Sequence, residues 1–258
     1  MRKYPLLVAG NWKMNGLRAN LSEIEALKAG VGSNETVGLW VFPPATLIES
    51  AASLASGSQL KVGGQDCRAE ESGAFTGDIS AGMLKDAGAS AVIVGHSERR
   101  SLHGETSAEV RAKAAAALKH GLDVIVCLGE TKGEREAGLA PAVCTRQLRE
   151  SLPQKSTPDN TIVAYEPVWA IGTGLSPTAA DISAIHATIR AELERRGTSE
   201  TAWRILYGGS VTSANAAAIF ESPETDGVLV GGASLNAASF LAIIAAASDA
   251  QRRRANQG

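Results

Sequence analysis

The sequence has 258 residues, of which 44% are hydrophobic and 20% are charged, with a formal net charge of −2 and a pI of about 6.1. This composition is typical of a globular chain with enough apolar material for a sizeable core. The near-neutral charge gives no reason to expect nucleic acid or an anionic membrane as a partner, and no apolar run approaches the ~20 residues that a membrane helix needs.

The N-terminus and the cysteines predict a reducing compartment, which we take to be the cytoplasm. Residues 1–5 lead straight into strand-like sequence and lack the apolar region and cleavage site of a signal peptide. Cys67, Cys127 and Cys144 are odd in number and widely spaced, which argues against both a disulfide framework and a zinc site. The histidines show no metal-ligand spacing, so no metal is expected.

Short apolar runs recur along the chain, each followed by a polar or glycine-bearing turn and then a helical pattern. Most runs are continuously apolar, which indicates strands buried on both faces, as in parallel sheets. The eight runs span residues 6–9, 37–42, 60–64, 91–95, 124–128, 162–165, 204–208 and 227–231.

The intervening helices carry start and stop signals. Residues 22–25 and 106–109 match a capping box, and Ser176 with Pro177 would cap and open a later helix. Gly121 and Gly197 are placed as helix stops.

Eight strands alternating with helices over ~250 residues predict a (β/α)₈ barrel. No linker interrupts the alternation, so we expect a single domain over residues 1–258. A doubly wound open sheet is the alternative, but it would need a glycine-rich dinucleotide loop after an early strand. Residues 11–15, Asn-Trp-Lys-Met-Asn, follow the first strand instead, so no nucleotide cofactor is expected.

Polar and glycine residues follow six of the predicted strands, and in a barrel these ends share one mouth, where active sites are built. They are Asn11 and Lys13, then His96, Ser97 and Glu98, then residues 127–130, then Glu166, then Gly208, Gly209 and Ser210, and finally Gly231 and Gly232. Singly, each has an ordinary structural explanation, such as a surface lysine or a glycine turn. Their joint placement favours an active site.

Glu166 ends a buried strand, and Pro167 biases it towards an extended backbone that aims its side chain. Residues 168–171 are too apolar for an ordinary surface loop, and Gly172 and Gly174 allow backbone conformations closed to other residues. We interpret this segment as a lid. The alternative is a solvated charge at a strand end, followed by core residues.

These residues divide into chemical roles. Glu166 can act as a base whose side-chain direction is fixed by the strand end, while Asn11, Lys13 and His96 can stabilise a developing oxyanion. Four residues could present backbone N–H groups to an anion: Gly172, Ser210, Gly231 and Gly232. Together they suit proton abstraction next to a carbonyl in a small phosphorylated molecule.

The sequence closely resembles the triosephosphate isomerase family over the whole chain. The blocks that carry the resemblance are residues 9–15 (AGNWKMN), 73–80 (GAFTGDIS), 95–100 (GHSERR), 127–130 (CLGE), 164–174 (AYEPVWAIGTG), 207–211 (YGGSV) and 227–235 (GVLVGGASL). The resemblance implies a TIM barrel and the interconversion of dihydroxyacetone phosphate and D-glyceraldehyde 3-phosphate in glycolysis and gluconeogenesis, without a cofactor.

By this resemblance, Glu166 would move a proton between neighbouring substrate carbons, and His96 would act as a neutral electrophile. Lys13 and Asn11 would stabilise the enediolate. The supporting residues would be Glu98 and Cys127. The phosphate would rest on Gly172, Ser210, Gly231 and Gly232, with Lys13 balancing its charge.

The resemblance also implies a lid and a homodimer. The lid and clamp residues would be Pro167, Trp169, Ile171 and Leu229, of which the last two would dry Glu166 and make it more basic. Residues 73–80 would form a loop that enters a second subunit near Asn11 and Lys13, whereas a monomer could tuck the apolar Phe75 of this loop into itself.

Three positions depart from the family's common pattern. Asp66 stands where asparagine is common, and Asp78 where glutamate is common. In the lid's far hinge, Pro177 replaces a residue whose N–H would bond to Tyr207 on closure, and proline has no N–H. We therefore expect that this latch is missing or rerouted through Ser210.

Two other functions remain as alternatives. Another phosphosugar isomerase or epimerase could use the same barrel, although an epimerase would need a metal or paired facing acids. A non-catalytic barrel that binds phosphosugars would be indicated by loss of Glu166, Lys13 or His96, and all three are present.

Overall fold

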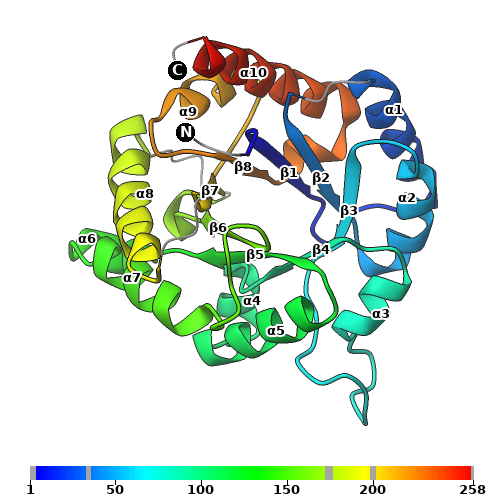
Figure 1. The fold of residues 1–258 in the computed structure, drawn as a ribbon, viewed down its shortest axis with the longest axis horizontal. Helices are drawn as coiled ribbons and strands as arrows, with labels where there is room; N and C mark the ends of the chain where they lie inside the picture. Colours follow the sequence, from blue (N-terminus) through cyan, green and yellow to red (C-terminus); the bar gives the residue numbers. More distant parts are fainter. Residues whose placement is uncertain (1–3, 33–35, 172–176, 198–201, 257–258) are drawn as a thin grey trace.

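The computed structural model describes residues 4–32, 36–171, 177–197 and 202–256. In this part of the chain, eight parallel strands close into a barrel inside a ring of helices (Figure 1). The strands are β1 (Leu7–Asn11), β2 (Gly38–Phe42), β3 (Leu60–Gly64), β4 (Ala91–Val94), β5 (Asp123–Leu128), β6 (Thr161–Tyr165), β7 (Arg204–Tyr207) and β8 (Gly227–Val230). Each pairs with the next along the chain, and β1 also pairs with β8. The predicted (β/α)₈ barrel is confirmed.

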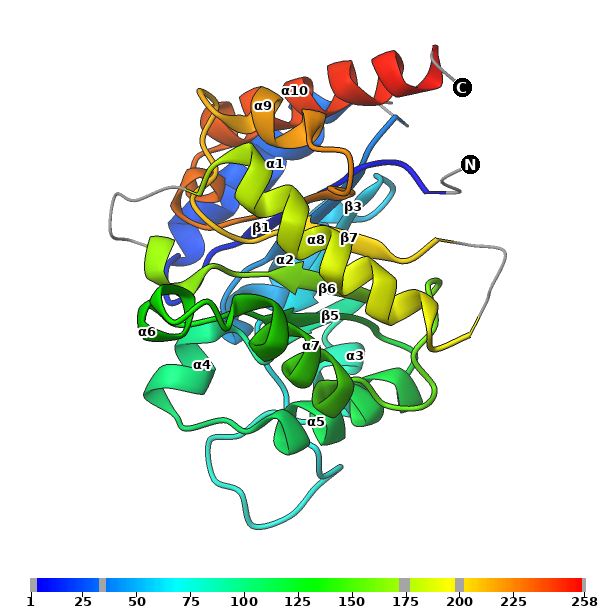
Figure 2. The same ribbon diagram turned by 90° about the vertical axis from the view of Figure 1, so that its left-hand side faces the viewer.

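The helices cover the outside of the barrel. They are α1 (Leu21–Val31), α2 (Ile48–Ala55), α3 (Ala81–Asp86), α4 (Ser97–Leu102), α5 (Ser107–Lys119), α6 (Lys132–Glu136), α7 (Ala140–Ser151), α8 (Ala179–Glu194), α9 (Ala216–Glu221) and α10 (Ala237–Ala255). In Figure 2, α4 and α6 lie towards one end of the barrel and α10 ends at the other. Within the described residues, no helix has the length and apolar character of a membrane span.

The core has two layers separated by the strands. Leu7 and Ala9 belong to the cluster inside the barrel, whereas Val8 packs in the outer cluster between strands and helices. A strand in a closed barrel therefore has neither face in water. This explains why the runs are continuously apolar rather than alternating.

The predicted helix starts are partly correct. Thr106 caps α5 in a reciprocal capping box with Glu109. The capping box predicted at residues 22–25 is wrong, because α1 begins at Leu21. Ser22 already lies in the first turn, where its hydroxyl donates to the carbonyl of Ala19.

The start of α8 also differs from the prediction. Thr178, not Ser176, is the capping residue, and Asp181 returns the hydrogen bond to its N–H. Pro177 lies before the helix rather than in its first turn, and Ser176 lies outside the described residues. Gly197 follows the helix with a φ of 115°, as predicted for a stop.

Several strand ends shift in ways that matter for the site. β1 continues past its predicted end at Ala9, so Asn11 is the last residue of the strand. Gly95, Gly208 and Gly231 lie just beyond β4, β7 and β8 instead of inside them.

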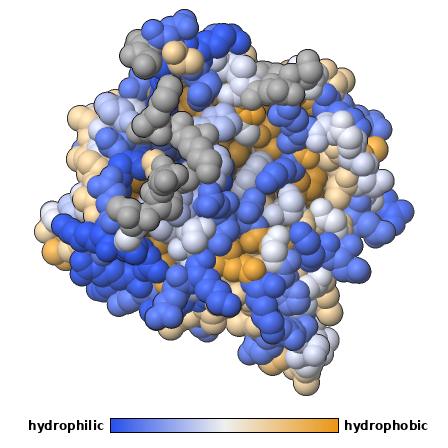
Figure 3. Space-filling model, in the orientation of Figure 1, coloured by the Kyte–Doolittle hydropathy of each residue, from blue (hydrophilic) through white to orange (hydrophobic). Residues whose placement is uncertain are grey.

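Residues 65–80, between β3 and α3, stand away from the barrel (Figures 1 and 2). They form the projection at the lower edge of the space-filling view (Figure 3). The guanidinium carbon of Arg68 lies 3.9 Å from the ring centroid of Phe75, and Arg68 also pairs with Asp78 at 2.6 Å. These contacts give the projecting loop a defined shape.

Candidate active site

Glu166 and His96 meet at the C-terminal ends of the strands. Glu166 follows β6 and His96 caps α4, and both side chains are buried. Glu166 Oε1 lies 2.9 Å from His96 Nε2, and Oε2 accepts the backbone N–H of Ser97 at 2.9 Å. The N–H of Glu98 donates to His96 Nδ1 at 3.2 Å. Nδ1 therefore carries no proton, and the neutral ring donates from Nε2 to the Glu166 carboxylate.

Lys13 reaches the same place from β1. Its φ of 53° lies in the left-handed region, which costs roughly 1–3 kcal/mol for a residue with a side chain. Two hydrogen bonds hold this backbone: its N–H donates to Asn11 Oδ1 at 2.9 Å, and its carbonyl accepts from Gln65 Nε2 at 2.8 Å. The Lys13 ammonium pairs with Glu98 Oε1 at 2.5 Å. The strained turn thus aims the ammonium towards the His96 end of α4.

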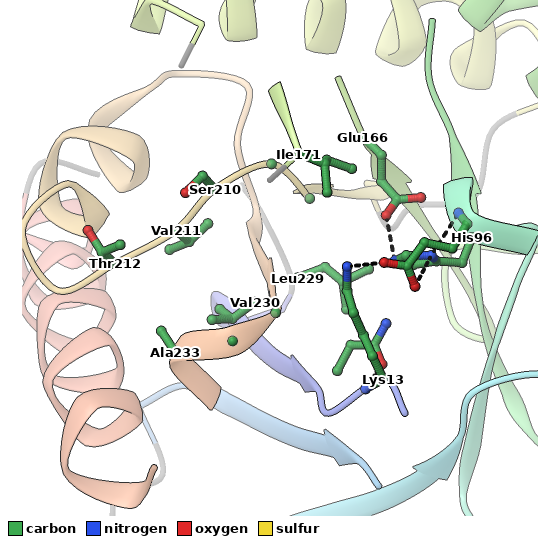
Figure 4. Close-up of a pocket in the computed structure, with 16 residues that line it drawn as sticks. Lys13, His96, Glu166, Ile171, Ser210, Val211, Thr212, Leu229, Val230 and Ala233 are labelled. Carbon is green, nitrogen blue, oxygen red and sulfur yellow. Dashed lines mark hydrogen bonds and ion pairs between the residues drawn. The ribbon is translucent and has the colours of Figure 1, made fainter. Parts of the chain in front are cut away.

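These groups form one side of a pocket of about 450 Å³. Figure 4 shows Glu166 and His96 on one side of it and Ser210 with Ala233 on the other. A Cβ added to Gly231 would lie 3.6 Å from Lys13 Cε, so Lys13 reaches towards both sides. The pocket combines a carboxylate, an imidazole and a cation at one end with glycine-rich backbone at the other.

Comparison with known proteins agrees with this arrangement. The family model described as triosephosphate isomerase matches residues 6–247. The chain belongs to the triosephosphate isomerase family. It is 59% identical to the triosephosphate isomerase of Afipia carboxidovorans over 92% of this chain and 95% of that one. It is 56% identical to that of Ruegeria pomeroyi over 95% and 98%. The crystal structure of triosephosphate isomerase from Bartonella henselae superposes with a TM-score of 0.88 at 44% identity, over 93% of this chain and 98% of that one.

Most of the residues singled out from the sequence line this one pocket. They are Asn11, Lys13, His96, Glu98, Glu166, Ile171, Ser210, Leu229, Gly231 and Gly232. Leu229 is buried in β8 inside the barrel, and Ile171 stands at the pocket's edge, at the end of the short 3-10 turn η3 (Val168–Ala170). Gly172, the remaining predicted phosphate-binding residue, lies outside the described residues, as does Gly174.

Pro167 and Trp169 do not line the pocket and belong to the segment after β6, which a hydrogen bond to Glu130 anchors. Pro167 precedes η3 with a φ of −66°. Trp169 Nε1 donates to Glu130 Oε1 at 2.8 Å, and the Tyr165 hydroxyl donates to the same oxygen at 3.1 Å. Glu130 is fully buried, and the Arg135 guanidinium lies over the Trp169 ring at 4.4 Å. This anchor was missed in the sequence, where Glu130 was placed at a strand end without a role.

Cys127 is buried against Glu166 and does not line the pocket. Burial raises the pKa of its thiol well above the usual value, and the Glu166 charge raises it further. The thiol is therefore a neutral neighbour of the carboxylate. Glycines complete the packing, because a Cβ on Gly208 would lie 2.8 Å from Glu166 Cγ and one on Gly129 would lie 1.7 Å from the Glu166 carbonyl oxygen.

The sequence reasoning also missed the backbone N–H of Ser97 and the lining residues Val211, Thr212, Val230 and Ala233. The only sequence signal for the first was its place at the start of a helix that follows a strand. Val211 and Thr212 follow the glycine-bearing end of β7, Val230 ends β8 and Ala233 follows the glycines after it, so the strand ends were located but not their individual lining residues.

Proposed function

We propose that this chain interconverts dihydroxyacetone phosphate and D-glyceraldehyde 3-phosphate by proton transfer through an enediolate. The observation that carries the proposal is the 2.9 Å approach of the buried Glu166 carboxylate to His96 Nε2, inside a pocket that also holds Lys13. The family membership supports the same reaction. No bound cofactor enters the steps below, since each uses only a side chain or a backbone group.

Glu166 is the proposed base. It takes a proton from the substrate carbon next to the carbonyl, the electron pair moves to the carbonyl oxygen, and the proton returns to the neighbouring carbon. Burial alone would raise the pKa of Glu166, but His96, the Ser97 N–H and Lys13 hold it below the usual value in this structure. A substrate oxygen that accepts the hydrogen bond from His96 Nε2 removes one of these contacts from Glu166, while the burial of Glu166 remains. Glu166 then becomes a stronger base.

His96 is the proposed electrophile. Its Nε2–H faces the pocket, and the Glu98 N–H on Nδ1 favours the neutral imidazole. A neutral imidazole can donate to one substrate oxygen and pass a proton between the two oxygens of the enediolate without the excess acidity of an imidazolium. Glu98 holds Lys13 beside it through their ion pair.

Lys13 and Asn11 complete the oxyanion site. An ammonium and an amide stabilise the negative charge that develops on the carbonyl oxygen. The Lys13 stem passes close to Gly231, so the same cation also balances a phosphate at the Ser210 side. We propose that backbone groups of Gly172, Ser210, Gly231 and Gly232 bind this phosphate.

The segment after Glu166 is the proposed lid. Ile171 and Leu229 both line the pocket, where they would exclude water from Glu166 once substrate is bound. Pro167 restricts the backbone at the start of the lid, and the hydrogen bond from Trp169 to Glu130 holds the segment after β6 in place. Cys127, which is buried next to Glu166, is a proposed supporting residue for this carboxylate.

We further propose that residues 1–258 act as one domain and that two copies pair through residues 73–80. Met14 is 96% exposed directly after Lys13, and Leu102 is 77% exposed one turn after Glu98, so apolar side chains flank the residues of the site. A second copy would cover them. All three cysteines are free and buried, which suits the cytoplasm.

The test is direct. Purified protein should isomerise D-glyceraldehyde 3-phosphate, and Glu166→Asp, which withdraws the carboxylate by one methylene, should lose roughly 10²-fold in kcat. An inactive wild-type protein would contradict the reaction. A fully active Glu166→Asp would contradict the assignment of the base.

A further inference from the structure

Arg100, in α4, reaches into the wall of the barrel and binds four neutral oxygens. Its Nε donates to the carbonyl of Gly95 at 2.9 Å. One terminal nitrogen, Nη2, donates to the carbonyl of Cys127 at 3.1 Å and to Ser151 Oγ at 3.0 Å. The other, Nη1, donates to Ser107 Oγ at 3.2 Å. One guanidinium thereby joins β5, the turn after β4, and helices α5 and α7.

The charge of Arg100 has no close counter-ion in the part of the chain that the structure describes. The neighbouring Arg99 pairs with Asp66 at 2.9 Å and Glu105 at 3.4 Å, but the partners of Arg100 are carbonyls and hydroxyls. A half-buried cation with neutral partners loses hydration without gaining an ion pair, and burial lowers the pKa of Arg100. Stability alone gives little reason for a cation here.

The backbone is shaped to admit this guanidinium. Gly95 has a φ of 69°, in the left-handed region that favours glycine. A Cβ at Gly95 would lie 3.0 Å from Arg100 Nη2 and 2.8 Å from a Val110 methyl. Position 95 therefore favours glycine both because of its left-handed backbone and because Arg100 and Val110 occupy the space of a Cβ.

Helix α4 has few apolar contacts that could fix its orientation. Ser97 is its one buried residue, and Leu102 is exposed. Polar contacts must therefore hold the helix, and those of Arg100 connect it to the turn after β4, to β5 and to helices α5 and α7. The N–H groups in the first turn of α4 are those of Ser97 and Glu98, which donate to Glu166 and to His96 Nδ1.

We propose that Arg100 is a positioning residue for the isomerase reaction: its guanidinium fixes α4 and the ends of β4 and β5, so that Ser97 and His96 face Glu166. Its hold on the Cys127 carbonyl steadies the strand whose thiol packs against Glu166. The positive charge of Arg100 also interacts favourably with the Glu166 carboxylate. Arg100 is not among the residues that line the pocket with Ser210, so it should act on turnover and not on phosphate binding.

Two substitutions test this, together with a matched control. Arg100→Met keeps most of the side-chain length and removes the charge and the hydrogen-bond donors. Arg100→Lys keeps the charge but loses the planar set of donors that the guanidinium provides. We expect kcat to fall roughly 10- to 100-fold in Arg100→Met and less in Arg100→Lys, with KM within about 3-fold of wild type. The control, Ser107→Ala, removes one of the four hydrogen-bond acceptors of Arg100 and keeps the guanidinium, so its kcat should stay within about 2-fold of wild type.

Nitrogen NMR of His96 gives a readout that a purely structural role would not move. Wild type should show Nδ1 unprotonated and Nε2 protonated, and Arg100→Lys should show a mixture of tautomers as the Glu98 N–H shifts away. Wild-type kcat and an unchanged His96 spectrum in Arg100→Lys would overturn the proposal, even if Arg100→Met failed to fold. Failure of both variants to fold would also overturn it, by showing a role in holding the barrel together. The proposal rests on the isomerase function, whose failure would appear separately as an inactive wild type in the same assay.

Discussion

The backbone N–H of Ser97 donates a 2.9 Å hydrogen bond to the Glu166 carboxylate. This contact joins the first turn of α4 to the end of β6. The second carboxylate oxygen faces His96, so one helix start supplies both partners of Glu166. The carboxylate is therefore held ionised in a buried place, which has consequences for stability as well as for catalysis.

Glu166 should make stability depend on acid pH. Its folded-state pKa is lowered, so its ionisation contributes stability above about pH 4.5, and this contribution is lost as the pH falls through the folded value. Glu166→Gln lacks this contribution of ionisation to stability. Over the range from about pH 4.5 to about pH 3.5, where His96 is already protonated because Glu166 raises its pKa against the effect of burial, the Tm difference, wild type minus variant, should therefore shrink in calorimetric scans. A difference that stays constant or grows on acidification would contradict the account.

Asp66 should behave in the opposite sense. Burial raises its pKa despite the contacts with Lys113 and Arg99, so ionised Asp66 carries a cost at neutral pH that vanishes below about pH 4. Asp66→Asn keeps the shape, and both cations keep Glu105. We expect its Tm to equal or exceed that of wild type by up to ~4 °C at about pH 7, and the difference to disappear near pH 4. A lower Tm for Asp66→Asn at neutral pH would show that the ion pairs outweigh burial.

Tyr207 tests the unusual hinge. Among the residues that the structure describes, its hydroxyl has no hydrogen-bond partner, and burial raises its pKa to about 12. Pro177 has no N–H to offer it. Tyr207→Phe should therefore change kcat by less than about 2-fold in steady-state assays, because no bond of about 1 kcal/mol is lost. A 10-fold or larger fall would mean that the hydroxyl serves lid closure through another partner.

Phe75 tests the proposed dimer. Arg68 stacks on its ring and helps to give the loop of residues 65–80 a defined shape. Phe75→Glu places a charge where the second copy would bind, so sedimentation should show more monomer and kcat should fall, because Asn11 and Lys13 lose their neighbour. Glu71→Gln, in the same loop but exposed, is the control and should remain dimeric. A Phe75→Glu variant as dimeric as wild type would place the interface elsewhere.

The barrel was predictable because burial on both strand faces leaves a simple pattern in the sequence. The position of the pocket followed from the barrel, since His96 and Glu166 come directly after apolar runs and Lys13 lies four residues beyond another. Helix starts were less predictable, because several polar residues compete to cap. Ser22 and Ser176 were chosen, whereas the helices begin after Asn20 and Thr178.

Residues that act through long side chains could not be found from the sequence. Glu130 meets Trp169 and Arg100 meets Cys127 across different strand ends, and neither pair has a characteristic spacing. Both Glu130 and Arg100 stood in blocks that resembled the family, but their partners depend on how the strand ends pack together. Asp66 likewise was seen only as a departure from the family's pattern, and its ion pair with Lys113 became visible only in the structure.

The central claim is that Glu166 moves the proton, and hydrogen exchange at carbon tests it most directly. In D₂O, the wild-type protein should incorporate deuterium at the substrate carbon next to the carbonyl, followed by NMR, as isomerisation proceeds. Glu166→Gln should reduce this exchange by about 10²- to 10⁴-fold, the usual contribution of a general base. Exchange in Glu166→Gln within about 10-fold of wild type, with the variant folded, would contradict the account.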